Sequence, residues 1–100
     1  MDTFTALAYP TRRQIIESLA VAEASFGELA DNFEMSRPAV SQHLKVLREA
    51  GLVTARADAQ RRIYRLNDDG LTEVEAWLGK VRDFWSQRLD QLEQLLGEAE

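Results

Sequence analysis

The segment from Met35 to Val53 constrains the fold of this 100-residue chain more than any other part of its sequence. Ser36 is well suited to begin a helix, because its hydroxyl can accept a hydrogen bond from the free amides of the first turn. Pro38 fits the same turn, where a missing N–H group has little effect. Gly51 is placed to end the helix, since glycine adopts a left-handed backbone without strain. The segment therefore predicts a short helix with a defined start and a defined end.

The two faces of this predicted helix differ in character. Val40, Leu44 and Leu47 recur at helical spacing and form one apolar stripe. At about 100° per residue, a polar set falls on the opposite side: Arg37, Ser41, Gln42, Lys45 and Arg48. The small Ser41 lies among three cations and allows a groove wall to approach closely. We interpret the segment as a DNA recognition helix.

The residues before this segment complete a helix-turn-helix. Ser25 and Glu28 fit the capping-box pattern, in which the two side chains satisfy amides at a helix start. Apolar positions of that helix follow at Leu29, Ala30 and Phe33. Two short helices with a short link, the second with a polar outer face, predict a helix-turn-helix at about residues 25–50.

Two further helices are expected upstream of this unit. A short amphipathic helix precedes residue 9, and a second helix begins at Pro10, with Ile15, Ile16 and Leu19 as its core stripe. Arg12 and Arg13 lie in the first turn of the second helix. Two interpretations of these arginines stay open, namely contact with a phosphate and ordinary solvation.

A hairpin is predicted directly after Gly51, at about residues 52–66. Residues 52–56 and 61–66 are rich in β-branched and aromatic side chains, and residues 57–60 form the turn, where Asp58 best tolerates an unusual backbone conformation. The hairpin carries four arginines: Arg56, Arg61, Arg62 and Arg65. We interpret it as a wing whose arginines contact phosphate, the alternative being an ordinary hairpin with solvated arginines.

A single long helix is predicted at about residues 68–97. Its apolar band is too wide for a narrow two-stranded seam and too long for a three-helix core to cover. We therefore predict a homodimer, with the N-terminal helix contributing, and a dimer interface made of Phe4, Leu7, Leu71, Val74, Leu78, Val81, Trp85, Leu92 and Leu95. The alternative is a monomer in which this helix folds back along its own domain. A second row of side chains includes Trp77 and Phe84, which with Trp85 could instead line a small-molecule pocket at the interface.

The charge distribution agrees with a single DNA-binding surface. The net charge is −5, but residues 36–65 hold seven basic and two acidic residues, while the segments on either side are acidic. An acidic remainder repels DNA from every other face of the molecule. The chain has no cysteine, no stretch that resembles a signal peptide and no apolar run long enough to span a bilayer, so we expect a single cytoplasmic domain over residues 1–100 that makes no membrane contact.

The order helix, helix, helix-turn-helix, hairpin, long helix resembles that of the ArsR-type (arsenic-repressor-like) winged-helix transcriptional regulators. Five segments also resemble signature segments of that family in their amino-acid sequence: residues 9–16 (YPTRRQII), 27–30 (GELA), 36–47 (SRPAVSQHLKVL), 50–53 (AGLV) and 63–66 (IYRL). Residues 84–89 further resemble a subgroup of small autorepressors. The resemblance covers nearly the whole chain and is most specific at residues 36–47. It implies a dimeric repressor with DNA contacts from the positions of Arg37, Ser41 and Gln42.

The chain departs from this family at the metal-sensing positions. Many members bind metals through a Cys-x-Cys pair, and the corresponding residues here are Ser25 and Gly27. Another site of the family uses histidine on the C-terminal helix, and this helix has none. We therefore expect no metal site and no cofactor. The only histidine, His43, lies at the edge of the apolar stripe, where core packing is favoured over base contact.

The sequence thus predicts a homodimeric repressor that binds double-stranded DNA at a pseudo-palindromic operator. The expected DNA-binding residues are Ser36, Arg37, Ser41, Gln42, Lys45, Arg48, Arg61 and Arg62. Two alternatives remain, a winged-helix protein-interaction module and a regulator that responds to a small molecule in the aromatic pocket. The sequence identifies no effector. An enzyme is not expected, because there is no nucleophile–base pair and no glycine-rich phosphate loop.

Overall fold

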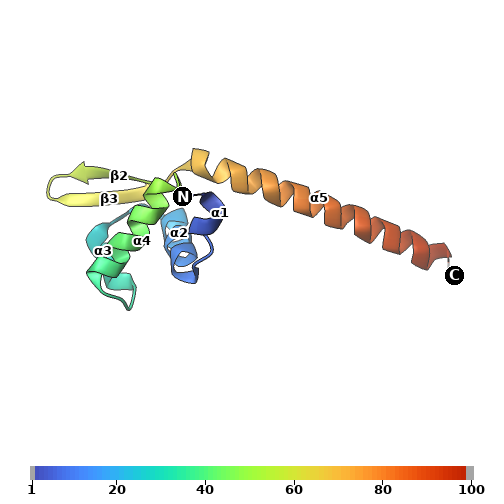
Figure 1. The fold of residues 1–100 in the computed structure, drawn as a ribbon, viewed down its shortest axis with the longest axis horizontal. Helices are drawn as coiled ribbons and strands as arrows, with labels where there is room; N and C mark the ends of the chain where they lie inside the picture. The colour runs from blue at the N-terminus through green and yellow to red at the C-terminus, as the bar shows by residue number, and fades with distance from the viewer. Residues whose placement is uncertain (1, 99–100) are drawn as a thin grey trace.

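The computed structural model describes residues 2–98, and Figure 1 shows the course of the chain. Within these residues the elements follow in the order α1 (Thr3–Ala6), α2 (Pro10–Val21), β1 (Ala24–Ser25), α3 (Phe26–Asn32), α4 (Arg37–Glu49), β2 (Val53–Asp58), β3 (Arg61–Leu66) and α5 (Asp68–Glu98). Residues 2–67 form a packed unit, here named the winged head, and α5 leaves it as a single rod. The predicted winged helix-turn-helix, mainly helical with a β-hairpin and a long last helix, is confirmed.

Polar side chains define the ends of the helix-turn-helix. The Ser25 Oγ accepts a hydrogen bond from the Glu28 amide at 3.1 Å, and the Glu28 carboxylate accepts one from the Ser25 amide at 3.3 Å. The Ser36 Oγ accepts from the Ala39 amide at 3.3 Å and caps α4. Gly51 has a φ of 79°, the left-handed conformation that favours glycine. The predicted capping box, the predicted N-cap and the predicted helix end are all confirmed.

The hairpin is more regular than predicted. The strands β2 and β3 pair along their full lengths, and the last pair is Asp58 opposite Arg61. Only Ala59 and Gln60 remain in the turn, and Ala59 adopts a left-handed φ of 57°. The expectation that Asp58 would take the unusual conformation is therefore wrong, because the strand pairing holds its backbone extended.

A third strand, β1, was not predicted from the sequence. Its two residues, Ala24 and Ser25, pair antiparallel with Tyr64 and Ile63 of β3, so that β3 is the central strand of the order β1-β3-β2. A two-residue strand is too short for an alternating pattern to reveal it. This pairing attaches the start of α3 to the wing and fixes the wing against the helix-turn-helix.

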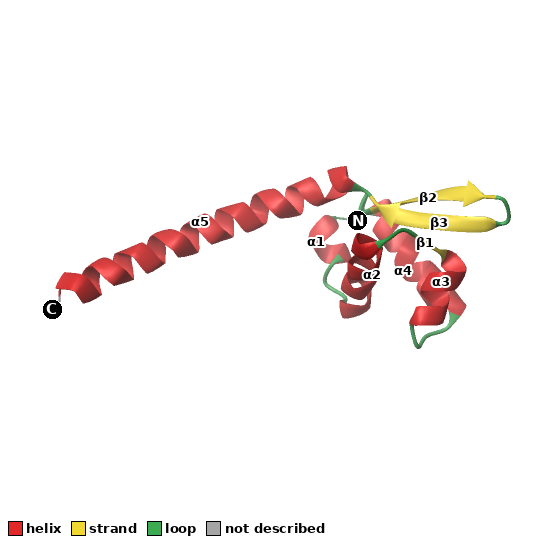
Figure 2. Cartoon of the chain, turned by 180° about the vertical axis from the view of Figure 1, so that it is seen from behind, coloured by secondary structure: helices red, strands yellow, loops and turns green. Residues whose placement is uncertain are grey.

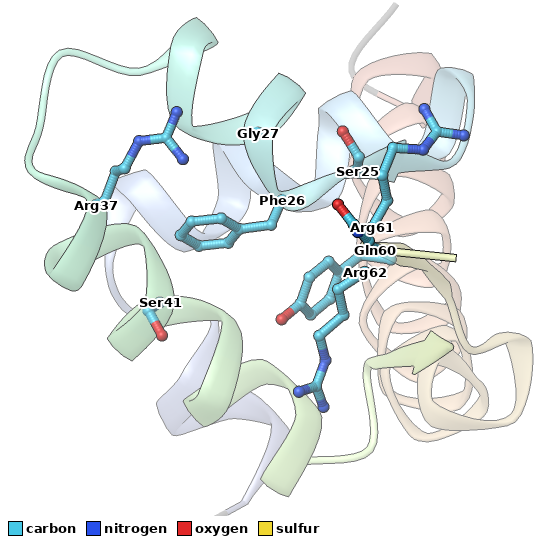
Figure 3. A pocket seen from close by; sticks show the side chains of 9 residues that line it. Ser25, Phe26, Gly27, Arg37, Ser41, Gln60, Arg61 and Arg62 are labelled. Carbon is cyan, nitrogen blue, oxygen red and sulfur yellow. The ribbon is translucent and has the colours of Figure 1, made fainter. Parts of the chain in front are cut away.

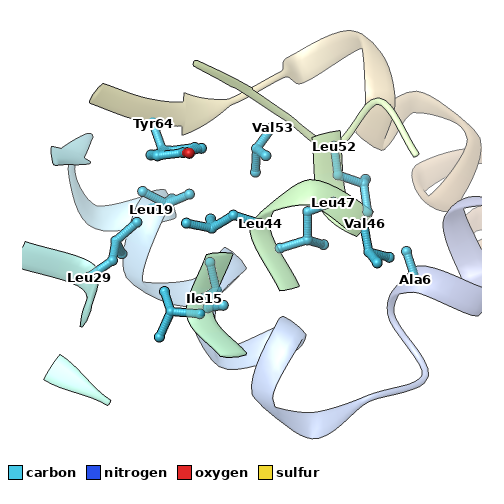
Figure 4. Packing of buried hydrophobic residues seen from close by; sticks show 11 residues of the cluster. Ala6, Ile15, Leu19, Leu29, Leu44, Val46, Leu47, Leu52, Val53 and Tyr64 are labelled. Atoms are coloured by element: carbon cyan, nitrogen blue, oxygen red, sulfur yellow. The ribbon is translucent and has the colours of Figure 1, made fainter. Parts of the chain in front are cut away.

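One core holds the winged head together, and Figure 4 shows its side chains converging from the helices and the hairpin. Its buried apolar residues are Ala6, Ile15, Leu19, Leu29, Val40, Leu44, Val46, Leu47, Leu52, Val53 and Tyr64. Val46 lies outside the predicted stripe of α4 and is nevertheless only 6% exposed. It is buried because α1 packs on a second flank of α4, with Ala6 close to Val46 (Figure 4).

The helix α5 begins in contact with the head and then leaves it. The Asn67 Nδ2 donates to the Gly51 carbonyl at 2.9 Å, and a Cβ on Gly70 would lie 1.9 Å from that same carbonyl oxygen. Only a glycine therefore fits where α5 crosses the end of α4. Beyond this junction the helix extends away from the hairpin in both views (Figures 1 and 2), and the molecule measures 68 × 27 × 23 Å. Among the described residues, no helix has the length and apolar character needed to cross a membrane.

Candidate nucleic-acid interface

All the residues that the sequence predicts to bind DNA are exposed on the winged head. Those of α4, from Arg37 to Arg48, point outward because the opposite face of the helix is buried in the core. Ser36 is also exposed, and its hydroxyl is engaged in capping α4. Arg61 and Arg62 are exposed at the start of β3, close to the tip of the wing.

A groove separates the first half of α4 from the wing, and we name it the α4–wing groove (Figure 3). It encloses about 480 Å³ and is lined by Ser25, Phe26, Gly27, Arg37, Ser41, Gln60, Arg61, Arg62 and Tyr64. Four of the predicted DNA-binding residues, two from α4 and two from the wing, thus share one groove. The fold brings these two groups together although more than 20 positions separate Arg37 from Arg61 in the sequence.

The second half of α4 borders another hollow, of about 520 Å³, against β2. Lys45 and Arg48 line it together with Glu49, Val53, Thr54 and Ala55. Gln42 lines neither hollow and lies exposed on the helix between them in sequence. The predicted residues therefore follow the outer side of α4 along its length.

Two of the groove arginines already have acidic neighbours. The Arg37 guanidinium lies 3.7 Å from the Asp31 carboxylate of α3, and the Arg61 guanidinium lies 3.4 Å from Asp58 across the turn of the wing. Both pairs are more than half exposed, so water screens them and each contributes little to stability. Either arginine can therefore exchange its carboxylate for a phosphate at small cost.

Arg56 of the wing is paired with an acidic side chain that the sequence did not predict. Its guanidinium donates two hydrogen bonds to the Glu23 carboxylate, at 2.9 and 2.7 Å. These hydrogen bonds lower the pKa of Glu23 and raise the pKa of Arg56. In the free protein this bidentate carboxylate engages both outer nitrogens of Arg56, and the interpretation of Arg56 as a phosphate-binding arginine stays a prediction. The pair joins β2 to the segment between α2 and β1.

Arg12 is buried, and neither interpretation offered for it applies. It is 8% exposed, its Nε donates to the His43 Nδ1 at 3.2 Å, and its Nη1 donates to the Ala6 carbonyl at 3.4 Å. The guanidinium also lies 4.2 Å from the centre of the Tyr9 ring. Arg12 therefore joins α1 and α2 to α4. The neighbouring Arg13 is exposed and donates to the Leu7 carbonyl at 3.0 Å.

His43 packs at the edge of the core, as predicted. Its Nδ1 accepts the hydrogen bond from Arg12, so the proton of the neutral ring is on Nε2. Burial, and secondarily the positive charge of Arg12, lower the pKa of His43 below its ordinary value. The neutral form of the ring is therefore the one that the fold favours.

The predicted dimer residues divide into two groups. Leu7 and Leu71 pack against the core of the head, whereas Val74 and Val81 are only partly buried along α5. The others are exposed apolar side chains, with exposed fractions of 38% for Phe4, 52% for Leu78, 58% for Trp85, 52% for Leu92 and 64% for Leu95. Phe4 makes an edge-to-face contact with Trp77, at 5.5 Å between ring centres, which joins α1 to α5 within one chain.

The positions that hold metal-binding cysteines in the resembling family have structural roles here. Ser25 is buried as the cap of α3, and Gly27 lies in the first turn of that helix. Among residues 2–98, no three histidine or carboxylate side chains gather in a way that could hold a metal ion. The expected lack of metal sensing stays a prediction.

Comparisons with known proteins agree with this architecture. The model of the family described as "Bacterial regulatory protein, arsR family" matches residues 9–55. An HTH-type transcriptional regulator of Mycobacterium tuberculosis is 46% identical over 91% of this chain and 82% of its own length. The transcriptional repressor SdpR of Bacillus subtilis is 31% identical over 77% of this chain and 86% of its own length.

A solved structure of a similar protein has the same fold as this chain. The crystal structure of a possible transcriptional regulator for arsenical resistance superposes with a TM-score of 0.75, covers 92% of this chain and 93% of its own, and is 43% identical. The identity to several relatives and the coverage of their lengths are high enough to decide the family. The chain belongs to the ArsR family of DNA-binding transcriptional regulators.

Proposed function

We propose that this chain is a transcriptional repressor that binds a pseudo-palindromic operator as a homodimer and requires no metal ion. The observation that carries the proposal is the α4–wing groove, where exposed cations from the recognition helix and the wing face the same space. Such a surface fits duplex DNA, whose affinity for proteins comes largely from phosphate contacts.

The exposed residues of α4 suit the major groove. Arg37 and Gln42 read base edges, since arginine pairs well with guanine and glutamine with adenine. Ser41, Lys45 and Arg48 lie beside them on the outer side of the helix and hold it in position. Arg61 and Arg62 of the wing contact phosphate or the adjacent minor groove. Ser36 supports this arrangement by capping the start of α4.

The apolar side chains of α5 support the homodimer. Leu78, Trp85 and Leu92 are each more than half exposed, and no element of the described chain covers them. An apolar face of this length in contact with water is unfavourable, and a second copy of α5 covers it. Two heads joined in this way present two recognition helices, and an operator with half-sites roughly 34 Å apart accommodates both.

The operator is found by selecting bound duplexes from a random library. Binding is then measured on the selected duplex and on a scrambled one, over a range of salt concentrations. Gln42→Ala should lose mainly the preference for the selected duplex, because it removes a base contact. Arg62→Ala should weaken binding to both duplexes and lower the salt slope by about one per subunit. Lys80→Ala, which removes a cation of α5 away from both hollows, is the matched control and should leave binding unchanged.

Three results would contradict the proposal. Equal losses on both duplexes for Gln42→Ala and Arg62→Ala would remove the division of roles. No binding to any duplex at low salt would favour the protein-interaction module instead. A reporter gene whose promoter contains the selected duplex should be silenced by the protein, and activation of that gene would contradict repression. Treatment with a metal chelator should leave the binding curve unchanged.

A further inference from the structure

Tyr64 lies at the base of the α4–wing groove and is not among the residues that the sequence predicts to bind DNA. It is in the central strand β3, between Ala24 of β1 and Ala55 of β2, and only 6% of it is exposed. It nevertheless lines the groove together with Arg37, Arg62 and the other groove residues. Its ring belongs to the core, so only a small part of the side chain reaches the groove.

The part of Tyr64 that reaches the groove is its hydroxyl. Within the described residues, the structure gives this hydroxyl no hydrogen-bond partner. No fully buried side-chain oxygen or nitrogen among these residues lacks a partner, so the unpartnered hydroxyl must touch solvent. A buried tyrosine usually satisfies its hydroxyl within the protein, and this one instead keeps an O–H group free.

Arginines from two elements line the groove that this hydroxyl reaches. The Arg62 guanidinium lies 6.0 Å from the centre of the Tyr64 ring, and Arg61 joins it from the same strand. Arg37 lines the opposite side of the groove, from α4 (Figure 3). One neutral donor at the base and guanidinium groups at the rim match the oxygens of a phosphate, which accept hydrogen bonds from both kinds of group.

The geometry of duplex DNA supplies the phosphate. A sugar–phosphate backbone runs between every major groove and the neighbouring minor groove. With α4 in the major groove and the wing over the adjacent minor groove, the space between them faces this backbone. We propose that the α4–wing groove holds a backbone phosphate of the operator and that the Tyr64 hydroxyl donates a hydrogen bond to it. The proposal rests on the proposed DNA-binding function.

This role has a signature that separates it from the arginines and from base-reading residues. A phosphate contact carries no sequence information, so its loss weakens binding to every duplex by the same factor. A neutral donor releases no counterion, so its loss leaves the salt slope unchanged. Loss of Arg62 lowers that slope, and loss of Gln42 changes the sequence preference.

The test is Tyr64→Phe, which removes one oxygen atom and keeps the buried ring. Its affinity for the selected duplex and for the scrambled duplex should fall by the same factor, roughly three- to tenfold per subunit. The salt slope should match that of the wild type, and so should the melting temperature, because the hydroxyl has no partner in the free protein. Tyr9→Phe, the same change at the only other tyrosine, should alter none of these quantities, since Tyr9 lies outside the groove.

Several results would overturn the inference. Wild-type affinity for Tyr64→Phe would show that the hydroxyl does not contact DNA. A loss confined to the selected duplex would mean a base contact. A lower melting temperature together with weaker binding would indicate a structural role for the hydroxyl. These results require a wild-type protein that binds DNA, and a wild type that binds no duplex would instead refute the proposed function itself.

Discussion

The winged head buries most of its large apolar side chains, whereas α5 exposes most of its own. Leu44 and Leu47 of the head are fully buried, whereas Leu89 and Leu96 of α5 are 57% and 60% exposed. The head closes its core within one chain because four helices and a sheet surround it. The helix α5 meets the rest of the chain at its start and through α1, and beyond that junction it extends away from the head (Figure 1).

This contrast separates what one chain can stabilise from what needs a second chain. Burial of apolar surface is the main driving force of folding, and an isolated helix without it is only marginally stable in water. The head therefore contains the proposed DNA-binding surface in a complete form, while in the proposed homodimer α5 is the element whose stability depends on association. Changes in α5 should affect assembly, and changes in the head should affect folding.

The largest expected effect comes from placing charges on the apolar face of α5. The double variant Trp85→Glu with Leu92→Glu should raise the dissociation constant of the dimer at least about 100-fold, because an unpaired buried carboxylate is strongly unfavourable. Sedimentation velocity measures this change, and circular dichroism should report an intact head. Gln87→Glu with Gln94→Glu adds the same charge to the opposite side of the helix and should leave the dimer intact. A wild type that sediments as a monomer would remove the basis of the contrast.

A smaller effect is expected at the junction of the two regions. Gly70→Ala should reduce the free energy of unfolding by about 1–3 kcal/mol, because the added methyl group meets the backbone of Gly51 and Leu52. Denaturant unfolding measures the change. Gly79→Ala is the matched control, since a Cβ there meets nothing within 4 Å, and helix propensity favours alanine by about 1 kcal/mol. Equal decreases in the free energy of unfolding for Gly70→Ala and Gly79→Ala would mean that the close contact of Gly70 at the junction is not the cause of the loss.

The smallest effect concerns the pH dependence of the head. The pKa of His43 is lowered in the folded protein by burial and by Arg12, so the unfolded chain binds the proton more tightly. The contribution of His43 to the free energy of unfolding should therefore be fully present above the ordinary histidine pKa of about 6.5. It should decrease as the pH falls below that value. His43→Gln keeps an acceptor for Arg12 and should abolish this decrease. Thermal unfolding measured between about pH 7.5 and about pH 5 tests this expectation. An unchanged pH profile in the variant would assign the effect to other groups.

Local sequence signals were sufficient for most of the fold. Ser25 and Ser36 cap helices through hydrogen bonds to amides three residues away, and Gly51 ends a helix through its own backbone conformation. The helix ends could therefore be predicted from the sequence. The polar face of α4 followed from helical periodicity in the same way. These predictions succeeded because the physical cause and its effect lie within one turn of the chain.

The remaining features depend on contacts between distant segments. Arg12 looked like a surface cation, and only the approach of His43, 31 positions away, shows why it is buried. The ion pair of Arg56 with Glu23, 33 positions away, was likewise not predicted, and Val46 is buried because of α1. Tyr64 could have been suspected from its position beside Arg62 in a predicted strand, but its free hydroxyl became visible only with the groove. Sequence patterns do not encode which distant segments meet.

The position of the aromatic side chains has a practical consequence for experiments on this molecule. Both tryptophans of the chain, Trp77 and Trp85, are in α5, and each is at least half exposed. Indole emission depends on the polarity of its surroundings, so the intrinsic fluorescence of this protein reports on α5 rather than on the head. On the proposed homodimer, dilution of the protein should shift the emission at the concentration where its copies separate, whereas unfolding of the head should change the surroundings of Trp77, which contacts Phe4, and not those of Trp85. If the proposed homodimer forms, the chain thus contains an optical probe of its own association and needs no attached label.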